Sequence, residues 1–180
     1  MRIIAGKFKG IQLNTFEYGN IRPTIDRVRE NIFNKIQFRI EGASVLDLFA
    51  GTGAISLEFI SRGANDVVVC DNNRDSINLI KRNFQKCKIT PNLLEGDYLE
   101  SLNKICNKKF DIIFIDPPFE SDFGQISIDY ISKNKILSEN GIVIYEHGAS
   151  KQFDIPQELK IADERKYGTV KVTYLVNKND

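Results

Sequence analysis

The stretch that decides the fold is Ser44–Ala54, which reads SVLDLFAGTGA. Its first half is short and apolar, as in a strand that is covered on both faces of a sheet. Its second half is a glycine turn that leads into a segment of helical length. A strand, a glycine turn and a helix in this order are typical of the first unit of a parallel α/β sheet.

The same pattern recurs along the chain. Apolar, β-branched runs predict strands at 66–71, 110–115 and 141–146, with a weaker candidate at 91–95. The segments between them predict helices at about 53–62, 73–87, 98–107 and 123–134. Two alternating runs, 159–166 and 169–177, meet at Tyr167-Gly168 and predict an antiparallel hairpin. We therefore expect a doubly wound, mostly parallel α/β sheet that ends in a hairpin.

Length and composition set limits on the class of protein. The chain has 180 residues, 42% hydrophobic and 27% charged, which suits one globular domain with a short appendage. The chain has three cysteines, no Cys-x-x-Cys pair and one histidine. This set argues against a zinc site and against a disulfide framework, so we expect no metal. No leader pattern and no apolar run of membrane-spanning length is present, and we expect a cytoplasmic protein without a membrane partner.

Charge is distributed unevenly along the chain. Lys and Arg total 25 and Asp and Glu total 24, but residues 1–41 carry eight basic and four acidic side chains. We therefore divide the chain into a basic N-terminal arm, 1–41, and a catalytic domain, 42–180. A basic arm indicates contact with nucleic acid, although a solvated surface explains the charge alone equally well.

The arm has a pattern of its own. Residues 2–4 and 11–13 predict a small hairpin, and Ile25, Val28, Ile32 and Ile36 form one apolar face of a helix that Thr24 would cap. For contact with RNA we select the polar side chains that lie off this face. They are Arg2, Lys7, Lys9, Arg22, Thr24, Arg27 and Arg29.

The glycine turn indicates a cofactor. In open parallel sheets ligands bind at the carboxyl ends of the strands, where Asp71 can accept hydrogen bonds from ribose hydroxyls. The third glycine of a dinucleotide fingerprint is replaced by Ser56, and Asp47 would repel a pyrophosphate but attract a sulfonium or an ammonium. This combination predicts S-adenosylmethionine. The candidate contacts are Asp47, Phe49, Gly51, Gly53, Asp71, Asn72, Asp97 and Tyr98, and Asp97 could equally be a helix cap.

A second motif, Asp116-Pro117-Pro118-Phe119, follows the 110–115 strand. The two prolines stiffen the backbone, so that the Asp116 carboxylate and a main-chain carbonyl form a rigid pair of acceptors for an exocyclic amine. Phe119 offers a flat face on which a base can stack. The motif alone could be a simple turn, but the glycine loop upstream favours a catalytic interpretation.

These motifs resemble those of class I S-adenosylmethionine-dependent amino methyltransferases, which share the sequence 47–53, Asp71 and the sequence 116–119. The segments 2–6, 22–33 and 61–64 narrow the resemblance. Over nearly its whole length the chain is similar to the bacterial RsmD-type methyltransferases. The resemblance implies a Rossmann-like, seven-stranded sheet and methyl transfer to the N2 amine of one guanine in 16S rRNA. It also implies a 30S particle, assembled or assembling, as the partner, and we expect a monomer.

Several alternatives stay open. An adenine-N6 methyltransferase would use the same Asp-Pro-Pro-Phe motif, and a non-catalytic RNA-binding assembly protein could keep the same fold. A dehydrogenase is disfavoured by Ser56 and Asp47. Glu146 is either a surface carboxylate or a contact to the guanine edge, and we expect a structural role for His147. Residues 147–158 suggest no role.

Overall fold

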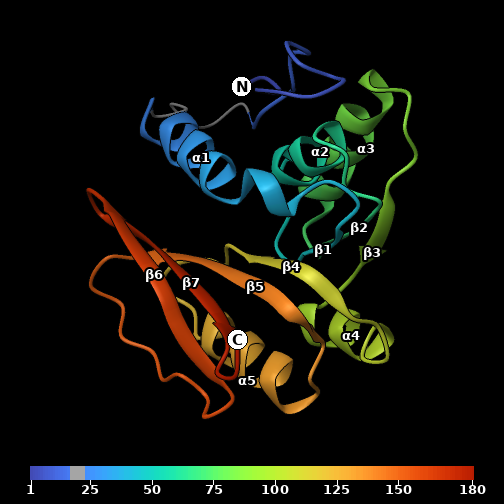
Figure 1. Ribbon diagram of the computed structural model, residues 1–180. Helices are drawn as coiled ribbons and strands as arrows, with labels where there is room; N and C mark the ends of the chain where they lie inside the picture. Colours follow the sequence, from blue (N-terminus) through green and yellow to red (C-terminus); the bar gives the residue numbers. More distant parts are fainter. Residues whose placement is uncertain (17–22) are drawn as a thin grey trace.

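The computed structural model describes residues 1–16 and 23–180, and of residues 23–25 the backbone alone. Helices cover both faces of one sheet, which gives three layers (Figure 1). The helices are α1 (Pro23–Ile36), α2 (Ala54–Ser61), α3 (Arg74–Lys86), α4 (Tyr98–Lys104) and α5 (Phe123–Lys133), with a 3-10 turn η1 (Gln37–Arg39). The strands are β1 (Ser44–Asp47), β2 (Asp66–Asp71), β3 (Asn92–Glu95), β4 (Phe110–Ile115), β5 (Leu137–Gly148), β6 (Leu159–Tyr167) and β7 (Val170–Asn177).

The sheet has the order β3-β2-β1-β4-β5-β7-β6. The first five strands of that order pair in parallel, and β7 pairs antiparallel with both β5 and β6. The chain builds outward from β1 to β3 and then returns to the other side of β1 with β4. The strand order reverses between β1 and β4, which is where an open parallel sheet binds its ligands.

Two hydrophobic cores lie on opposite faces of the sheet. Val45 and Phe114 belong to the core under α1, α2 and α3, whereas Leu46 and Ile113 belong to the core above α4 and α5 (Figure 1). Successive side chains of a strand point to opposite faces, so continuous apolar runs are what such a doubly covered sheet requires. The predicted fold class is confirmed, including the weak strand at 92–95 and the closing hairpin.

Two details differ from the sequence-based expectation. The helix α1 begins at Pro23, so Thr24 is its second residue rather than its cap. Proline suits the first helical position because its missing N–H would have had no partner there. In the arm, the predicted hairpin is present but short: one antiparallel bridge joins Arg2 and Gln12, and the N–H groups of Ile3 and Leu13 donate to the carbonyls of Ile11 and Met1 at 3.1 and 3.0 Å.

The N-terminal segment is held by a buried carboxylate on α2. Glu58 is fully buried and accepts the backbone N–H groups of Ile4 at 2.7 Å and Ala5 at 3.0 Å, while it pairs with Arg62 at 2.7 Å. Such charge-assisted hydrogen bonds are about twice as strong as neutral ones. The segments 2–6 and 61–64, which the sequence singled out as signatures, therefore lie against each other.

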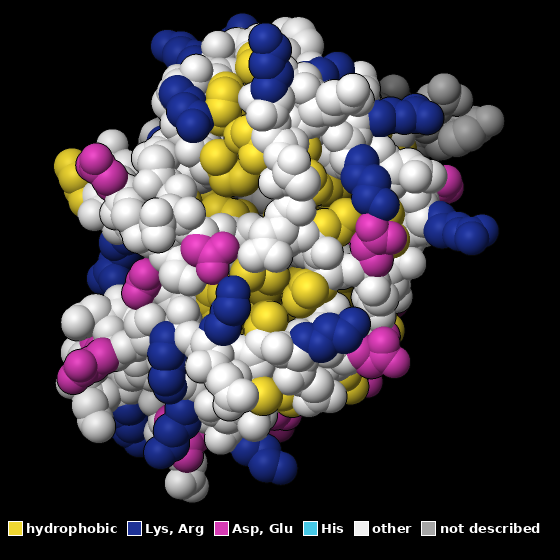
Figure 2. All heavy atoms as spheres, turned by 90° about the vertical axis from the view of Figure 1, so that its right-hand side faces the viewer, with side chains coloured by type: hydrophobic (Ala, Val, Ile, Leu, Met, Phe, Trp, Pro, Cys, Tyr) yellow, Lys and Arg dark blue, Asp and Glu magenta, His cyan; other side chains and the backbone are white. Residues whose placement is uncertain are grey.

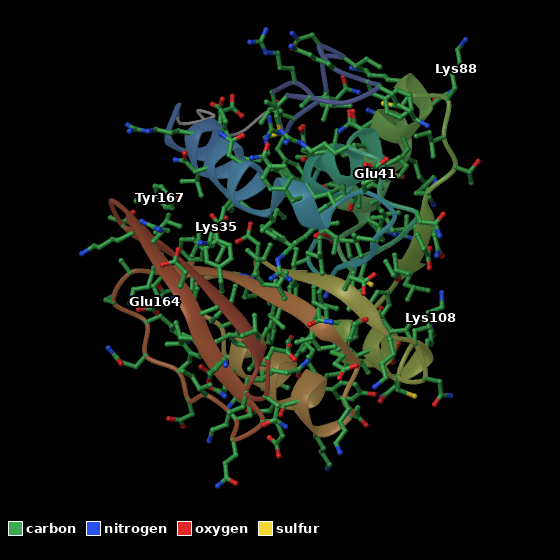
Figure 3. The ribbon with its side chains drawn as sticks, viewed as in Figure 1. Lys35, Glu41, Lys88, Lys108, Glu164 and Tyr167 are labelled. Atoms are coloured by element: carbon green, nitrogen blue, oxygen red, sulfur yellow. The ribbon has the colours of Figure 1, made fainter. Side chains whose placement is uncertain are left out.

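Helix α1 is attached by both apolar and polar contacts. Phe33 is fully buried and packs edge-on against Phe59 with ring centroids 4.8 Å apart. Burying a side chain of this size contributes about 1.5–3 kcal/mol. Figure 3 shows Lys35 between α1 and the β6–β7 hairpin, where its ammonium pairs with Asp163 at 2.7 Å and lies over the ring of Tyr174. The segment 1–41 and the sheet thus share one core.

No helix in the described part of the chain is both long and apolar enough to cross a membrane.

Candidate active site

A cleft of about 660 Å³ opens at the carboxyl ends of β1, β2 and β4, beside the point where the strand order reverses. Its size is within the range of ordinary small-molecule sites. Both motifs that the sequence singled out contribute to its walls. The lining residues are Phe16, Leu48, Phe49, Gly51, Asp71, Asn72, Asn73, Asp75, Ser76, Gly96, Tyr98, Asp116, Pro117, Pro118, Phe119 and Phe123.

Asp71 fixes the glycine loop. One of its carboxylate oxygens accepts the N–H of Gly51 at 2.8 Å, and the other accepts the N–H of Asn73 at 2.8 Å. Gly51 has a φ of 55°, a left-handed conformation that side chains other than glycine rarely adopt. Each carboxylate oxygen can accept a further hydrogen bond, and because Asp71 lines the cleft it suits the hydroxyls of a ribose.

Asp47 lies beneath the loop rather than in the wall of the cleft. Its side chain is buried, and one oxygen accepts a hydrogen bond from Ser56 at 2.5 Å. The other oxygen has no partner among the described residues. Burial, with a smaller contribution from the Asp71 charge, raises the pKa of Asp47 to about 7. A buried carboxylate oxygen that lacks a donor is costly, and a nearby cationic ligand would relieve that cost.

The same contact explains why the chain departs from the dinucleotide fingerprint. Where that fingerprint has its third glycine, Ser56 supplies the hydroxyl that holds Asp47. Gly53 is also beneath the cleft, with a φ of 73°, and an added Cβ would lie 3.2 Å from Phe84. Gly53 and Asp47 therefore shape the loop from below, whereas Gly51 and Asp71 face the cleft.

Three aromatic rings form an apolar wall. Tyr98 and Phe123 have ring centroids 4.8 Å apart, and Phe49 stacks on Phe123 at 6.3 Å with nearly parallel planes. Asp97 is exposed, accepts the N–H of Leu99 at 2.9 Å and caps α4. It is not among the residues that line the cleft, so of its two predicted roles, cofactor contact and helix cap, the structure supports the helix cap.

Asp116 lies at the opposite wall, where β4 ends. Its pKa is raised well above the ordinary value by burial first, then by the charge of Glu146 and that of Asp47. The carbonyl of Pro118 accepts hydrogen bonds from the Ser121 N–H at 2.9 Å and from its hydroxyl at 2.6 Å. It is therefore occupied, whereas the carbonyl of Pro117 has no hydrogen-bond partner in the described residues.

Sequence reasoning missed seven of the lining residues, which are Phe16, Leu48, Asn73, Asp75, Ser76, Gly96 and Phe123. Asn73 could have been recognised, because an asparagine directly before a predicted helix is a typical N-cap, and its side chain accepts the N–H groups of Asp75 and Ser76. Phe123 and Phe16 belong to no motif. Phe16 is near the cleft because Asn83, buried on α3, connects two backbone segments, accepting the N–H of Asn14 at 2.7 Å and donating to the carbonyl of Thr52 at 2.8 Å.

The predicted RNA contacts separate into three groups. Arg2, Lys7, Lys9 and Arg27 are exposed. Arg22 and the side chain of Thr24 lie outside the described residues. Arg29 is wrong as a surface contact: it is buried, donates to the carbonyl of Arg2 at 2.6 Å and pairs with Asp26 at 3.3 Å. Its position on the inner side of α1 explains this, because the helix turns it toward the N-terminal segment.

The face that carries Lys88 and Lys108 is shown in Figure 2, with Lys and Arg side chains dispersed and Asp and Glu side chains between them.

His147 points into the interior, where its Nε2 is 2.9 Å from the hydroxyl of Thr173 and its ring stacks on Tyr145. That burial agrees with the structural role expected for it.

Comparison with known proteins decides the family. A family model described as conserved hypothetical protein 95, that of the RsmD proteins, matches residues 1–176. This chain belongs to the RsmD family. The ribosomal RNA small subunit methyltransferase D of Haemophilus influenzae is 30% identical over 174 residues, which cover 94% of this chain and 90% of that protein. The enzyme of the same name from Escherichia coli is 30% identical over 81% of this chain and 74% of its own length.

Solved structures agree with this placement in the RsmD family. The structure of yhhF from Escherichia coli superposes with a TM-score of 0.84 at 26% identity, covering 98% of this chain and 97% of that one. The structure of HI0767 from Haemophilus influenzae has a TM-score of 0.78 at 28% identity, with 98% and 97% covered. The matches span both the N-terminal segment and the closing hairpin, so both belong to the region that RsmD proteins have in common.

Proposed function

We propose that this protein transfers a methyl group from S-adenosylmethionine to the exocyclic N2 amine of a guanine in 16S rRNA. The observation that carries the proposal is that the glycine loop with Asp71 and the Asp116-Pro117-Pro118-Phe119 motif open into one cleft. Membership of the RsmD family, whose relatives are named as rRNA small subunit methyltransferases, supports it.

The cofactor half of the cleft fits S-adenosylmethionine. When bound, this cofactor supplies a methyl carbon activated by a positively charged sulfur. The unpartnered oxygen of Asp47 suits the cationic end of such a molecule, and Asp71 suits its ribose. Phe49, Tyr98 and Phe123 offer an apolar wall for the adenine.

At the other half, the carboxylate of Asp116 and the carbonyl of Pro117, which has no partner among the described residues, accept hydrogen bonds from the amine. The lone pair of the guanine N2 is delocalised into the ring, which makes it a weak nucleophile. Hydrogen bonds from its two N–H groups to these acceptors favour a pyramidal nitrogen and direct the lone pair toward the methyl carbon. The nitrogen becomes acidic only as the new bond forms, and Asp116 then lies in position to receive the proton.

The target base must leave its helix to reach this cleft. Flipping costs a few kcal/mol, and stacking on the exposed ring of Phe119 offsets about 1–3 kcal/mol of it. The exposed basic residues of the 1–41 arm, Arg2, Lys7, Lys9 and Arg27, would contact phosphates, with Arg22 and Thr24 as further candidates. The 42–180 domain would carry the chemistry, in a monomer that acts on a 30S particle.

An adenine-N6 methyltransferase is the second candidate, because the Asp-Pro-Pro-Phe motif presents the same acceptors to an adenine amine. A non-catalytic assembly protein would bind RNA but transfer no methyl group.

The test is to incubate the protein with methyl-labelled S-adenosylmethionine and 30S particles from cells that lack this protein. We expect label in 16S rRNA, with little in particles from cells that contain the protein. Absence of label from every particle and RNA tested would contradict the proposal.

A further inference from the structure

A carboxylate outside the recognised motifs lies beside Asp116. The strands β4 and β5 pair in parallel with Ile115 opposite Tyr145. Asp116, the first residue after β4, therefore lies beside Glu146 of β5, whose charge acts on it. Paired strands are about 4.8 Å apart. Ile115 and Tyr145 both pack in the core above α4 and α5. Because side chains alternate along a strand, Glu146 points to the opposite face, the one covered by α1 to α3, whereas Asp116 lines the cleft just past the end of β4.

Neither carboxylate is neutralised by the described part of the protein. No hydrogen bond or ion pair from a described residue reaches the side chain of Asp116 or of Glu146, although both are half-buried. Burial raises the pKa of Glu146 to about 7, and the charge of Glu146 raises the pKa of Asp116 further. Two neighbouring acceptors without donors destabilise the free protein, which is typical of groups placed for a ligand.

The ligand chemistry that matches two such acceptors is a pair of adjacent donors. Guanine has one on its Watson–Crick edge, where the N1–H lies next to the N2 amine. Adenine has an amine next to N1 as well, but its N1 is an acceptor and carries a lone pair in place of a hydrogen.

We infer that Glu146 is a specificity-determining residue whose carboxylate accepts the N1–H of the guanine whose N2 amine is held by Asp116. The inference rests on the proposed function and adds the reason for the choice of base. A base without a hydrogen on N1 brings its lone pair against the Glu146 carboxylate and leaves that charge without a donor. Sites built to bond a donor reject analogues that lack it by factors of about 10⁴–10⁵.

The experiment compares two bases that share the 2-amino group but present either an N1–H or an N1 lone pair to Glu146, and the Glu146 variants separate this difference from the loss of the oxygen at C6. Small subunits are reconstituted with guanine or with 2-aminopurine at the position that the wild-type enzyme methylates. 2-Aminopurine keeps the amine that accepts the methyl group but has a lone pair at N1. For the wild-type enzyme we expect kcat/KM to be at least 100-fold higher for guanine than for 2-aminopurine.

In Glu146→Gln the amide can donate to a lone pair at N1 as well as accept. We expect its guanine rate to fall at least 10-fold and its preference for guanine over 2-aminopurine to drop at least 10-fold from the wild-type ratio. Glu146→Asp keeps an acceptor and should retain the preference at a lower rate. Glu139→Gln, on the exposed amino end of the same strand, is the matched control and should leave rate and preference unchanged.

Binding of S-adenosylmethionine, measured by calorimetry, should be the same in the wild type and in all three variants, which shows that each is folded. An unchanged guanine rate and preference in Glu146→Gln would overturn the inference while leaving the proposed function intact. If instead the wild-type enzyme itself fails to methylate guanine, the proposed function fails and the inference falls with it.

Discussion

At the scale of single residues, the proposed function assigns the chemistry of the amine to Asp116. Asp116→Asn keeps the size of the side chain but turns one acceptor into a donor that faces the N–H groups of the target. Because removing one preorganised polar contact of this kind costs about 10²–10³ in kcat, we expect a loss of at least that size. Binding of S-adenosylmethionine should change little.

Single-turnover methyl transfer and calorimetric binding of the cofactor measure the two effects separately. Asp129→Asn, an exposed aspartate on α5, is the control and should behave as the wild type. Methyl transfer by Asp116→Asn within threefold of the wild-type rate would contradict the role assigned to Asp116.

Asp47 gives the apoprotein a pH-dependent stability. Its pKa is raised from 3.8 to about 7 in the folded state, so the folded state binds a proton more readily than the unfolded state. For an acid with a raised pKa, the contribution to the free energy of unfolding decreases as pH rises from about 4 to about 7 and stays low above that. At about 1.4 kcal/mol per pKa unit, the upper limit of this decrease is about 4 kcal/mol.

Asp47→Asn removes the ionisable group, so the Tm of the variant relative to the wild type should increase by several degrees from pH 5 to pH 8. Thermal unfolding without cofactor, at constant ionic strength, measures the difference. Addition of S-adenosylmethionine should raise the Tm of the wild type at pH 8 and that of the variant far less. A Tm difference that is the same at every pH would contradict this account.

At the scale of elements, the sequence predicted more of the sheet than of the arm. Continuous apolar runs identified the strands because both faces of the sheet are covered. Arg29 was misplaced because helical periodicity does not reveal which neighbours surround a polar side chain, here the carbonyl of Arg2 and the carboxylate of Asp26. Phe16 escaped prediction because its place in the cleft depends on Asn83, a contact between residues far apart in sequence.

The docking of the N-terminal segment on α2 can be tested with two glycines. Gly6 and Gly10 both have positive φ, of 80° and 88°, so alanine strains the backbone equally at either position, by about 1–2 kcal/mol. A Cβ on Gly6 would lie 1.8 Å from the carbonyl oxygen of Ser61, whereas a Cβ on Gly10 meets nothing within 4 Å.

We therefore expect Gly6→Ala to lower the Tm by several degrees more than Gly10→Ala. Because the docked segment leads to Phe16, Gly6→Ala should also weaken methyl transfer to RNA. Differential scanning calorimetry of the two variants gives the comparison. Equal losses of Tm would show that the segment does not rest on Ser61 in solution.

At the scale of the whole molecule, a net charge of +1 conceals a basic segment. If Arg2, Lys7, Lys9 and Arg27 contact phosphates, replacing all four by glutamine should reduce the slope of log affinity for RNA against log salt by about 3, near 0.7–0.9 for each lost contact. The control replaces Lys104, Lys108, Lys133 and Lys178, exposed residues in or after α4, α5 and β7, and should leave the slope unchanged. Equal slopes for both quadruple variants, measured from 50 to 300 mM salt, would refute the role of the arm.

The most direct test of the account is the identity of the methylated nucleoside. 16S rRNA from 30S particles treated with the protein and S-adenosylmethionine would be digested to nucleosides and analysed by mass spectrometry against synthetic standards. The account predicts one N2-methylguanosine per particle, absent when Asp116→Asn replaces the wild-type protein. N6-methyladenosine, or no methylated nucleoside above the untreated control, would contradict it.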